Sequence, residues 1–362
     1  MKIGIIGTRG IPNYYGGFEE CAQQIATRMA SRGHQVIVYN SHSHPYQQKD
    51  FEGVEIIHKY DPEHRIGTAG QFIYDLNCIL DARWRNFDAI LMLGYTSSSI
   101  WQRLIPHKSA IITNMDGLEW KRSKYSPRVQ RFLKRAEKWA ANGSHVLIAD
   151  SVEIQNYLNK KYKNQVIFIP YGAEKFKSAN PNILEKYGVE PGEYNLVIAR
   201  LEPENNLETI LGGIQKSKSP KVTLVVGNHE TSYGEYLKST FKDSRIRFIK
   251  ATYKKENIYN LRYFSHIFFH GHSVGGTNPS LLEAMGCSSM ICAHDNPFNR
   301  EVLGDDATYF MDVNDVANAA DLLERNDIQI QKIKNNIGKL NNRYNWDLVS
   351  EQYELVFQQA AI

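Results

Sequence analysis

Residues 271–286 read Gly271-His272-Ser273-Val274-Gly275-Gly276-Thr277-Asn278-Pro279-Ser280-Leu281-Leu282-Glu283-Ala284-Met285-Gly286, and this stretch decides the fold. The apolar run before it, residues 266–270, predicts a buried strand, and residues 281–285 have the composition of a helix. The stretch is therefore a glycine-rich loop that leads from a strand into a helix. We expect Asn278 to be the helix N-cap and Pro279 to occupy the first helical position.

The chemistry of this loop indicates a nucleotide ligand. The N-terminus of a helix presents free N–H groups and a partial positive charge, and glycine lets the backbone come close to a ligand. Glu283 lies one turn inside the helix, where its carboxylate can accept hydrogen bonds from sugar hydroxyls. A second interpretation stays open, because Ser280-x-x-Glu283 can also be a capping box whose glutamate binds only backbone.

The start of the chain predicts a parallel, doubly wound α/β sheet. A short apolar strand at 2–7 is followed by a glycine-bearing loop, a helix and a second strand at 35–39. The loop lacks the G-x-G-x-x-G fingerprint, and Tyr39-Asn40 stand where a dinucleotide-binding protein has an acidic residue. A nicotinamide or flavin role is therefore disfavoured. Gly16 and Gly17 at the helix start suit a sugar or a phosphate, although a flexible lid with Tyr14 and Tyr15 as ordinary packing is the alternative.

Two acidic residues follow a predicted buried strand at 109–114. Asp116 and Glu119 lie after its carboxyl end, which is where open α/β sheets bind ligands. Both are candidates for contacts with substrate hydroxyls or for acid–base work. The alternative is that they cap the next helix and pair with Lys121 and Arg122, and we favour this alternative for Glu119.

The segment Pro127 to Ala141 predicts a basic amphipathic helix. Such a helix can lie on an anionic membrane surface, but a solvated face is the commoner explanation of a run of charges. Its basic residues are Arg128, Arg131, Lys134, Arg135 and Lys138.

Length and composition indicate a two-domain globular protein. The 362 residues are 42% hydrophobic with a net charge of +4, which is not a nucleic-acid-binding signature. We expect an N-terminal domain at 1–175, a C-terminal domain at 176–345 and a terminal helix at 346–362 that packs back on the first domain. The four cysteines have no metal-ligand spacing, so we expect buried free thiols of a reducing cytoplasm. The N-terminus does not look like a signal peptide, and no apolar run approaches the ~20 residues of a membrane span.

Over almost its whole length the chain resembles the GT-B glycosyltransferases, in particular glycosyltransferase family 4. Within that family it is most similar to the bacterial polysaccharide rhamnosyltransferases. The motifs that carry the resemblance are Gly7-Thr8-Arg9-Gly10-Ile11-Pro12, Gly16-Gly17, residues 116–122, Ile169-Pro170-Tyr171-Gly172-Ala173, residues 199–206, residues 270–280, residues 299–305 and a helix at 346–357.

The resemblance implies two Rossmann-like, doubly wound parallel-sheet domains that face each other across a cleft. It implies that Arg200 contacts the donor diphosphate and that Glu283 holds the ribose hydroxyls. The remaining donor-side residues that it implies are Gly16, Gly17, Asn205, Gly276, Thr277, Asn278, Pro279 and Ser280. On the acceptor side we expect Tyr14, Tyr15 and Glu119, and we expect Asp116 to join Arg200 in catalysis.

Three positions depart from the family pattern. The first glutamate of the family's two-glutamate motif falls at Gly275, and the lysine beyond the phosphate-binding arginine falls at Asn205. The histidine of the N-terminal domain is replaced by Asp116. These departures affect the donor-sugar contacts and the phosphate charge balance, and they leave Arg200 and Glu283 in place.

The expected activity is a retaining, metal-independent transfer of L-rhamnose from dTDP-L-rhamnose to a lipid-linked glycan. No cofactor, no metal and no nucleic-acid partner is expected, and the protein is expected in the cytoplasm or peripherally at the inner face of the membrane. Transfer of glucose or another hexose from UDP-glucose or another nucleotide hexose, a noncatalytic sugar-nucleotide-binding protein and a nucleotide-sugar epimerase are the alternatives.

Overall fold

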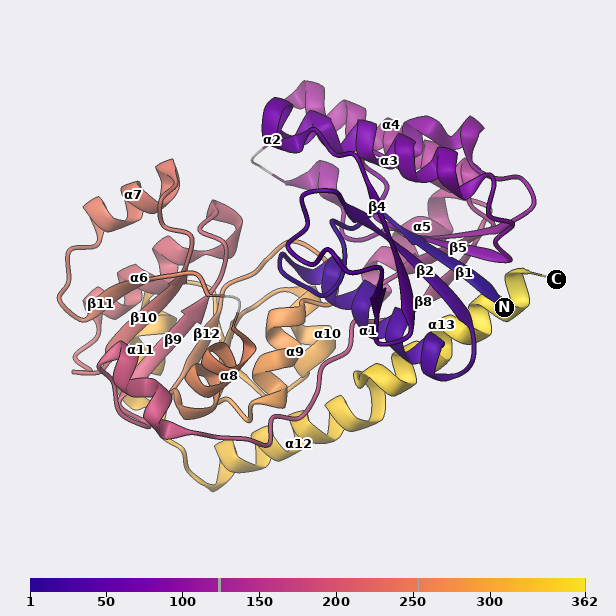
Figure 1. Ribbon diagram of the computed structural model, residues 1–362. Coiled ribbons are helices and arrows are strands. Elements are labelled where there is room, and N and C mark those ends of the chain that lie inside the picture. The colour runs from indigo at the N-terminus through magenta and orange to yellow at the C-terminus, as the bar shows by residue number, and fades with distance from the viewer. Residues whose placement is uncertain (123–124, 253, 362) are drawn as a thin grey trace. The chain divides into compact units, whose positions relative to one another are not determined.

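The computed structural model describes residues 1–122, 125–252 and 254–361, which form two compact units (Figure 1). Unit 1 comprises Met1–Tyr171 and Trp346–Ile362, and unit 2 comprises Gly172–Asn345. Each unit has a sheet and a hydrophobic core of its own.

Unit 1 is built on an eight-stranded sheet in the order β3-β4-β2-β1-β5-β6-β7-β8. Its strands are β1 (Lys2–Ile6), β2 (Gln35–Ser41), β3 (Asp50–Phe51), β4 (Val54–Lys59), β5 (Ala89–Leu93), β6 (Ala110–Asn114), β7 (Val146–Ala149) and β8 (Gln165–Phe168). All pairs are parallel except β3 with β4. The central strands are continuous apolar runs, as expected for a parallel sheet that is covered on both faces.

The helices of unit 1 cover this sheet. They are α1 (Gly17–Ser31), α2 (Glu63–Ile66), α3 (Gly70–Ala82), α4 (Pro127–Gly143), α5 (Val152–Lys161) and α13 (Trp346–Ala360), with short 3-10 helices η1 (Gly67–Ala69), η2 (Ser99–Leu104) and η3 (Glu119–Lys121). The C-terminal helix α13 packs on α1, and just beyond the end of α1 its Glu354 pairs with Arg32 at 2.6 Å and His34 at 2.8 Å. It also reaches β6, where Asn114 donates a hydrogen bond to Tyr353.

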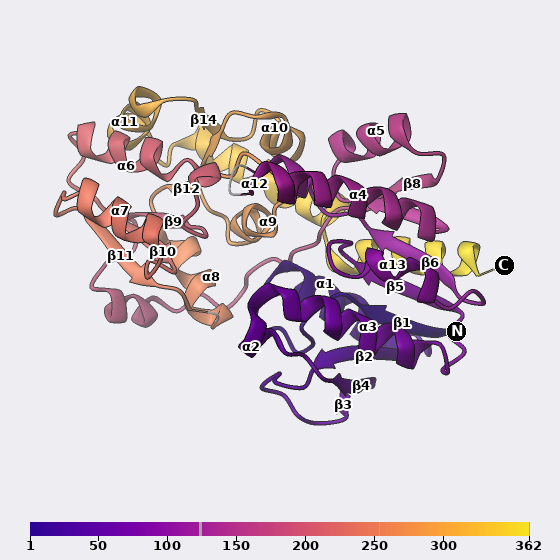
Figure 2. The same ribbon diagram turned by 90° about the horizontal axis from the view of Figure 1, so that it is seen from above.

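Unit 2 holds a six-stranded, fully parallel sheet in the order β11-β10-β9-β12-β13-β14. Figure 2 shows the sheet and its helices from above. The strands are β9 (Tyr194–Ile198), β10 (Val222–Gly227), β11 (Ile246–Lys250), β12 (Phe268–His270), β13 (Ile291–His294) and β14 (Thr308–Phe310). The helices are α6 (Leu207–Lys216), α7 (Ser232–Thr240), α8 (Lys255–Phe264), α9 (Pro279–Gly286), α10 (Pro297–Leu303), α11 (Val313–Leu322) and α12 (Asp327–Arg343), with η4 (Pro181–Tyr187) and η5 (Pro203–Asn205).

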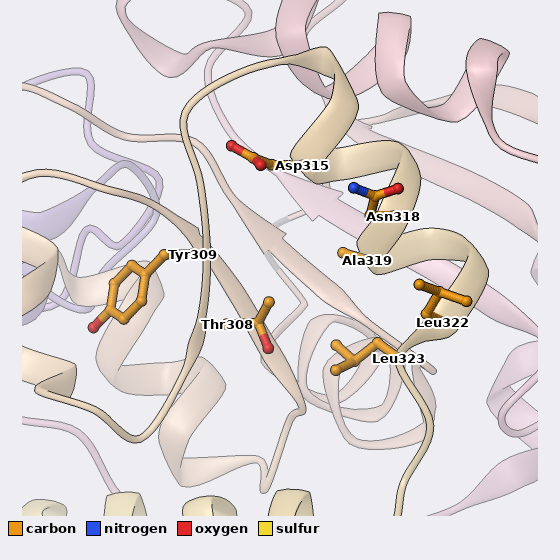
Figure 3. A pocket seen from close by; sticks show the side chains of 7 residues that line it. All are labelled: Thr308, Tyr309, Asp315, Asn318, Ala319, Leu322 and Leu323. Atoms are coloured by element: carbon orange, nitrogen blue, oxygen red, sulfur yellow. The ribbon is translucent and has the colours of Figure 1, made fainter.

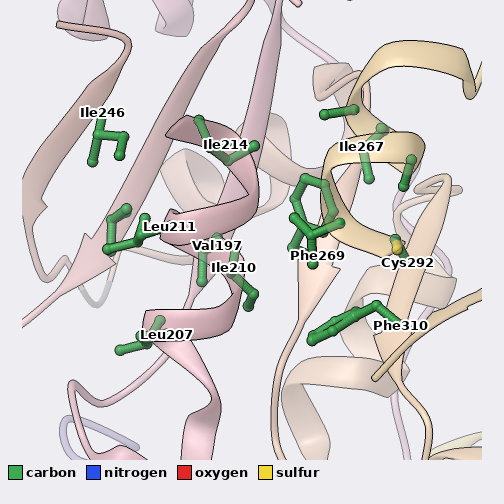
Figure 4. Close-up of a cluster of buried hydrophobic side chains, with 14 of the residues drawn as sticks. Val197, Leu207, Ile210, Leu211, Ile214, Ile246, Ile267, Phe269, Cys292 and Phe310 are labelled. Atoms are coloured by element: carbon green, nitrogen blue, oxygen red, sulfur yellow. The ribbon is translucent and has the colours of Figure 1, made fainter. Parts of the chain in front are cut away.

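The core of unit 2 forms between α6 and the sheet (Figure 4). Leu207, Ile210, Leu211 and Ile214 follow the spacing of one helix face and are almost completely buried. They pack against side chains of the strands, including Phe269 of β12. Burying one such side chain contributes about 1.5–3 kcal/mol, so this face holds α6 on the sheet.

The strand order creates one switch point in each sheet. In unit 1 the order reverses between β1 and β5, and in unit 2 it reverses between β9 and β12. Loops that leave the carboxyl ends of the two strands at a switch point diverge, and the crevice between them is where doubly wound sheets bind ligands. The predicted α/β class with doubly wound parallel sheets is confirmed.

Two further sequence predictions can be compared with the fold. All four cysteines, which lie in the described ranges, are buried free thiols as predicted. Across residues 1–122, 125–252 and 254–361, no helix is both long enough and apolar enough to cross a membrane.

Candidate functional site

Two loops of unit 2 leave the switch point between β9 and β12. Residues 199–206 follow β9 and carry Arg200 and Asn205, and residues 271–278 follow β12 and lead into α9. Since β9 and β12 are adjacent and parallel, both loops emerge at the same edge of the sheet. The structure thus brings together the residues of unit 2 that were predicted to bind a nucleotide.

The two loops are fixed to each other by backbone and side-chain contacts. Ser273 donates through its backbone N–H and its hydroxyl to the carbonyl oxygen of Glu204, at 3.3 and 2.7 Å. Asn206 donates to the carbonyl oxygen of Gly271 at 2.7 Å. A Cβ atom on Gly271 would lie 2.0 Å from the carbonyl oxygen of Asn205, so only glycine allows this approach. The loops therefore form one rigid surface.

Arg200 and Asn205 have different environments in this surface. The side chain of Arg200 is 66% exposed, and the nearest carboxylate, Glu202, lies 4.0 Å away. Asn205 is buried and donates its side-chain amide to the carbonyl oxygen of Arg200 at 2.7 Å. Arg200 is therefore accessible to an anion, whereas Asn205 shapes the loop from within.

The start of α9 has the predicted local structure. Asn278 is the N-cap and accepts a hydrogen bond from the backbone N–H of Ser280 at 2.9 Å, and Pro279 is the first helical residue. The capping-box interpretation of Ser280-x-x-Glu283 is wrong. Because the cap is Asn278, Glu283 lies beyond the capping position, and its carboxylate accepts a hydrogen bond from the Arg262 side chain at 2.5 Å.

Two residues of the glycine-rich loop, and the last residue of the strand before it, are defined by their backbone or burial. Gly275 has φ +128°, a conformation that side-chain-bearing residues rarely adopt, although nothing lies within 4 Å of the Cβ that a substitution would add. The glycine at this position is thus required by the backbone and not by lack of space. Thr277 is buried, and His270 is buried and stacked on His272 with ring centroids 4.5 Å apart. Burial lowers the pKa of His270 well below its ordinary value, so its imidazole is neutral.

In unit 1 the loop after β1 carries the aromatic residues that were predicted to contact the acceptor. Tyr14 and Tyr15 are 51% and 54% exposed, and Gly16 caps α1 in an extended conformation before Gly17 begins the helix. Arg9 lies 3.7 Å from the centre of the Tyr15 ring and donates two hydrogen bonds to Glu63, at 2.9 and 2.7 Å. The exposed rings lie outside the core, which does not favour the interpretation of both tyrosines as ordinary packing.

Asp116 has an unusual backbone conformation at the carboxyl end of β6. Its φ is +52°, in the left-handed region that is costly for a residue with a side chain. Its backbone N–H donates to the side chain of Asn114 at 3.0 Å, and Asn114 is itself held by Tyr353 of α13. The surrounding structure therefore fixes Asp116 in a strained position, which is typical of functional sites.

Glu119 forms the ion pair that we favoured for it. Its carboxylate lies 2.7 Å from the Arg122 side chain, and both side chains are mostly buried. This contact confirms the pairing interpretation and engages the carboxylate of Glu119 with Arg122.

Sequence reasoning missed Glu137, a buried carboxylate on the inner face of α4. It accepts hydrogen bonds from Trp120, Tyr157, Lys161 and Tyr162 at 2.6 to 2.9 Å. These contacts attach the segment that follows Asp116 to α4 and α5. The sole signal in the sequence is one acidic residue in a basic helix, and it does not identify the four partners.

A cavity lies elsewhere in unit 2, on the edge strand β14 and α11 (Figure 3). It has a volume of about 300 Å³ and is lined by Thr308, Tyr309, Asp315, Asn318, Ala319, Leu322 and Leu323. Asp315 accepts hydrogen bonds from the backbone of Met311 and Asp312 and so serves to cap α11. We therefore do not assign the candidate site to this cavity. Within the described part of the chain, no group of three or more His, Cys, Asp or Glu side chains could hold a metal ion.

The sequence matches one known family in each half of the chain. Residues 1–174 match a domain of unknown function (DUF1972), and residues 179–339 match the family described as Glycosyl transferases group 1. No curated protein matches the sequence significantly.

Solved structures match the chain from end to end. Sucrose-phosphate synthase of Thermosynechococcus elongatus has a TM-score of 0.79 at 16% identity, over 99% of this chain and 98% of that one. HepE of Anabaena, solved with UDP and glucose, has a TM-score of 0.78 at 15% identity, over 99% and 100% of the two chains. The UDP-forming α,α-trehalose-phosphate synthase of Burkholderia xenovorans has a TM-score of 0.71 at 11% identity, over 99% and 100%. These likenesses confirm the predicted GT-B fold, and together with the group 1 match they support a glycosyltransferase.

A buried carboxyl group beneath the loop after β5 leads to a prediction about pH. Asp75 of α3 is buried and accepts a hydrogen bond from Ser97 at 2.6 Å. Burial raises the pKa of Asp75 to about 7, against a smaller lowering by Ser97 and with a further increase from Asp61. Between pH 4 and pH 7 the folded protein keeps this proton and the unfolded chain loses it. The contribution of the protonated group to stability is therefore complete below pH 4 and is lost as the pH rises through 7.

We expect Asp75→Asn to remove this loss. The free energy of unfolding of the variant, relative to the parent, should increase by up to roughly 4 kcal/mol between pH 4 and pH 8. Urea unfolding at several pH values measures the difference, and Asp305→Asn, at a fully exposed carboxylate, is the control. A difference between Asp75→Asn and the parent that stays constant with pH would contradict the prediction.

Proposed function

We propose that this chain is a retaining glycosyltransferase that moves a sugar from a nucleoside diphosphate to a glycan acceptor. The observation that carries the proposal is the pair of loops fixed to each other at the switch point of unit 2, one of which carries the exposed Arg200 while the other leads into α9. The match of residues 179–339 to Glycosyl transferases group 1 supports the same class. HepE was solved with UDP-glucose, which supports a nucleotide sugar as the donor.

In this proposal Arg200 and α9 stabilise the leaving diphosphate. The exposed guanidinium of Arg200 can bind phosphate oxygens through two parallel hydrogen bonds. The N-terminus of α9 adds backbone N–H groups and the positive end of the helix dipole. Because these donors are fixed before the reaction, they stabilise the negative charge that develops as the glycosidic bond breaks.

We further propose that attack occurs on the face from which the diphosphate departs. A bond forms between the acceptor oxygen and the anomeric carbon while the bond from that carbon to the phosphate oxygen breaks. The proton of the acceptor hydroxyl passes to the leaving phosphate, so no enzymic nucleophile is required. Asp116 is proposed as the polar group of unit 1 that assists this step, whereas Glu119 is engaged with Arg122.

L-Rhamnose from dTDP-L-rhamnose is the proposed donor, within the rhamnosyltransferase subgroup of family 4. Rhamnose is a 6-deoxy sugar, and a buried polar side chain that faced its methyl group would stay unpaired at a cost of about 1–3 kcal/mol. Gly275 presents no side chain to the donor, and Asp116 replaces a possible hydrogen-bond donor by an acceptor. The competing explanation for glycine at position 275 is its positive φ, which disfavours any residue with a side chain. UDP-glucose is therefore the alternative donor, and a noncatalytic binding protein is the alternative of a different class.

The first test concerns Arg200 and the absence of a metal requirement. We expect Arg200→Ala to lower turnover of the donor roughly 100-fold or more, because the leaving diphosphate loses its main cationic partner. We expect EDTA to leave the parent's turnover unchanged, since the sequence has no Asp-x-Asp triplet to hold a cation against the diphosphate. Turnover of radiolabelled donor measures both effects, and Arg247→Ala, at an exposed arginine of β11, is the control.

Three results would count against this mechanism. Full activity of Arg200→Ala would show that the diphosphate binds elsewhere. Loss of activity in EDTA that Mg²⁺ or Mn²⁺ restores would show a metal-dependent reaction. Binding of nucleotide sugars without turnover of any donor would favour the noncatalytic alternative.

The second test concerns the sugar. With dTDP-L-rhamnose and UDP-glucose present together and a glucose-terminated lipid acceptor, we expect rhamnose to be transferred preferentially. Mass analysis of the product distinguishes the two sugars, because a deoxyhexose and a hexose differ in mass. Preferential transfer of glucose would refute the rhamnose assignment and leave the glycosyltransferase proposal intact.

We also propose that unit 1 rests on an anionic membrane surface, where a lipid-linked acceptor would be found. Basic side chains of α4 that are exposed are Arg128, Arg131, Lys134, Arg135 and Lys138. Phe132 of α4 contacts Phe72 of the neighbouring helix α3, with ring centroids 5.9 Å apart. Ile73 and Leu80 of α3 are exposed seven residues apart, which places them on one face of the helix, and Trp84, two residues beyond the end of α3, is 85% exposed. The exposed cations of α4 can meet anionic headgroups, and the exposed apolar side chains at the neighbouring helix can enter the boundary with the acyl chains.

Reversing four of these charges should release the protein from anionic vesicles. We expect the variant with Arg128, Arg131, Arg135 and Lys138 changed to Glu to lose binding at low salt, since each cation contributes about 1 kcal/mol near such a surface. Lys134 is left unchanged because its ammonium lies 4.2 Å from the centre of the Trp120 ring. Vesicle co-sedimentation measures the effect, and a variant with Lys186, Lys218, Lys242 and Lys334 changed to Glu matches the change in net charge. Failure of the parent to bind such vesicles would refute the membrane proposal.

A further inference from the structure

Arg262 is a buried arginine whose side chain is directed at the candidate site. It lies on α8, is 1% exposed, and is the largest of the fully buried side chains. Figures 1 and 2 show α8 and α9 side by side. A buried guanidinium is costly unless charged and polar partners surround it, so its partners indicate why it is retained.

The partners of Arg262 are two residues of α9. One terminal nitrogen, Nη1, donates to Oε2 of Glu283 at 2.5 Å. The other, Nη2, donates to the hydroxyl of Ser280 at 2.9 Å. The planar guanidinium therefore contacts both polar side chains in the first two turns of α9 that the nucleotide prediction had singled out.

The side chain of Arg262 is oriented so that its two terminal nitrogens, and not Nε, donate to α9. Nε of Arg262 is buried and has no hydrogen-bond partner among residues 1–122, 125–252 and 254–361. The backbone of Arg262 is anchored as well, because its carbonyl oxygen accepts hydrogen bonds from Ser265 at 2.8 Å and from Ser289 at 3.0 Å. Hydrogen bonds thus hold both the backbone and the guanidinium of Arg262, and they keep the guanidinium directed at α9.

Glu283 is held by only one of its two carboxylate oxygens. Its side chain is 24% exposed, and in the described part of the chain Oε1 accepts no hydrogen bond. A glutamate without a partner would lose side-chain conformational entropy on binding a ligand. The contact with Arg262 restricts that freedom in advance and leaves Oε1 to accept hydrogen bonds from a ligand hydroxyl.

We propose that Arg262 is a positioning residue for nucleotide recognition, which holds Glu283 and Ser280 in the geometry that reads the ribose hydroxyls of the donor. This inference rests on the proposed function, because it takes the ligand of α9 to be a nucleoside diphosphate. In this proposal Arg262 does not contact the ligand. It nevertheless determines whether the protein distinguishes a ribose that has a 3′-hydroxyl from one that lacks it.

The test compares nucleotides with and without that hydroxyl. The probes are UDP and dTDP, each measured against its 3′-deoxy analogue by titration calorimetry. The parent should bind the hydroxylated nucleotide roughly tenfold or more tightly, which is the size expected for one hydrogen bond to a charged group. In Arg262→Gln and Glu283→Gln this preference should fall to about twofold or less. Arg262→Lys, which keeps the charge and loses the fork, should retain an intermediate preference.

A merely structural role of Arg262 would weaken both nucleotides of a pair equally and leave the preference unchanged. Arg245→Gln is the matched control, since Arg245 is also an arginine of unit 2 that contacts a carboxylate, Asp243, and several carbonyl oxygens. It should alter stability and leave the preference at the parent's value. Thermal unfolding of each variant identifies those that fold, and Arg262→Lys decides the question if Arg262→Gln does not fold.

The outcomes separate the inference from the proposed function. If Glu283→Gln loses the preference and both folded Arg262 variants keep it, the positioning role of Arg262 is overturned and the glycosyltransferase proposal stands. If the parent binds none of the four nucleotides, the proposed function is overturned and the inference with it. Loss of the preference in Arg262→Gln, with the preference retained in Arg245→Gln, supports the inference.

Discussion

The architecture of the candidate site depends on a backbone contact that only glycine permits. At the switch point of unit 2, two loops leave adjacent parallel strands at the same edge, and Gly271 lets one loop lie directly against the carbonyl oxygen of Asn205. Unit 1 has a related constraint on the other strand of its switch point, because a Cβ on Gly7, which follows β1, would lie 2.3 Å from the carbonyl oxygen of Leu93 in β5. In each doubly wound sheet a glycine thus allows a close backbone approach at the switch point. The surface that results in unit 2 is rigid, and a rigid array of donors stabilises a developing anion better than one that must reorganise.

What the sequence could predict was determined by the distance along the chain between the interacting residues. The N-cap at Asn278, the proline after it and the ion pair of Glu119 with Arg122 are local features, and local rules predict them. Arg262 and Glu283 lie on different helices, and nothing in their spacing indicates that they meet. The same holds for Glu137, whose donors come from two separate segments, η3 and the C-terminal half of α5 with its cap. The capping-box interpretation failed because Asn278, two residues before Ser280, is the N-cap, and the carboxylate of Glu283 pairs with Arg262 instead.

Backbone conformation adds information at the two positions that depart most from the family pattern. Gly275 and Asp116 both have positive φ, at +128° and +52°. Glycine adopts such a conformation at little cost, whereas aspartate adopts it at a cost that neighbouring contacts must offset. A glycine at 275 is therefore explained by the path of the chain alone, but an aspartate at 116 is not. The two departures thus differ in the cost of their backbone conformation, and one sequence without its structure gives no means of ranking them.

The helix α13 belongs to unit 1 although the whole of unit 2 is synthesised before it. On the ribosome, residues 1–171 emerge first, yet the partners of Asn114 and Arg32 on that helix are made last. Unit 1 therefore leaves the exit tunnel with an uncovered surface over α1 and β6, and it keeps that surface exposed while unit 2, whose chain is continuous, can already fold. Unit 2 can therefore complete its folding before unit 1, which is the reverse of the usual order, in which the N-terminal domain folds first. For this chain the time between translation of unit 1 and arrival of its last helix is a period of risk for aggregation, and its length is set by the rate of elongation through unit 2.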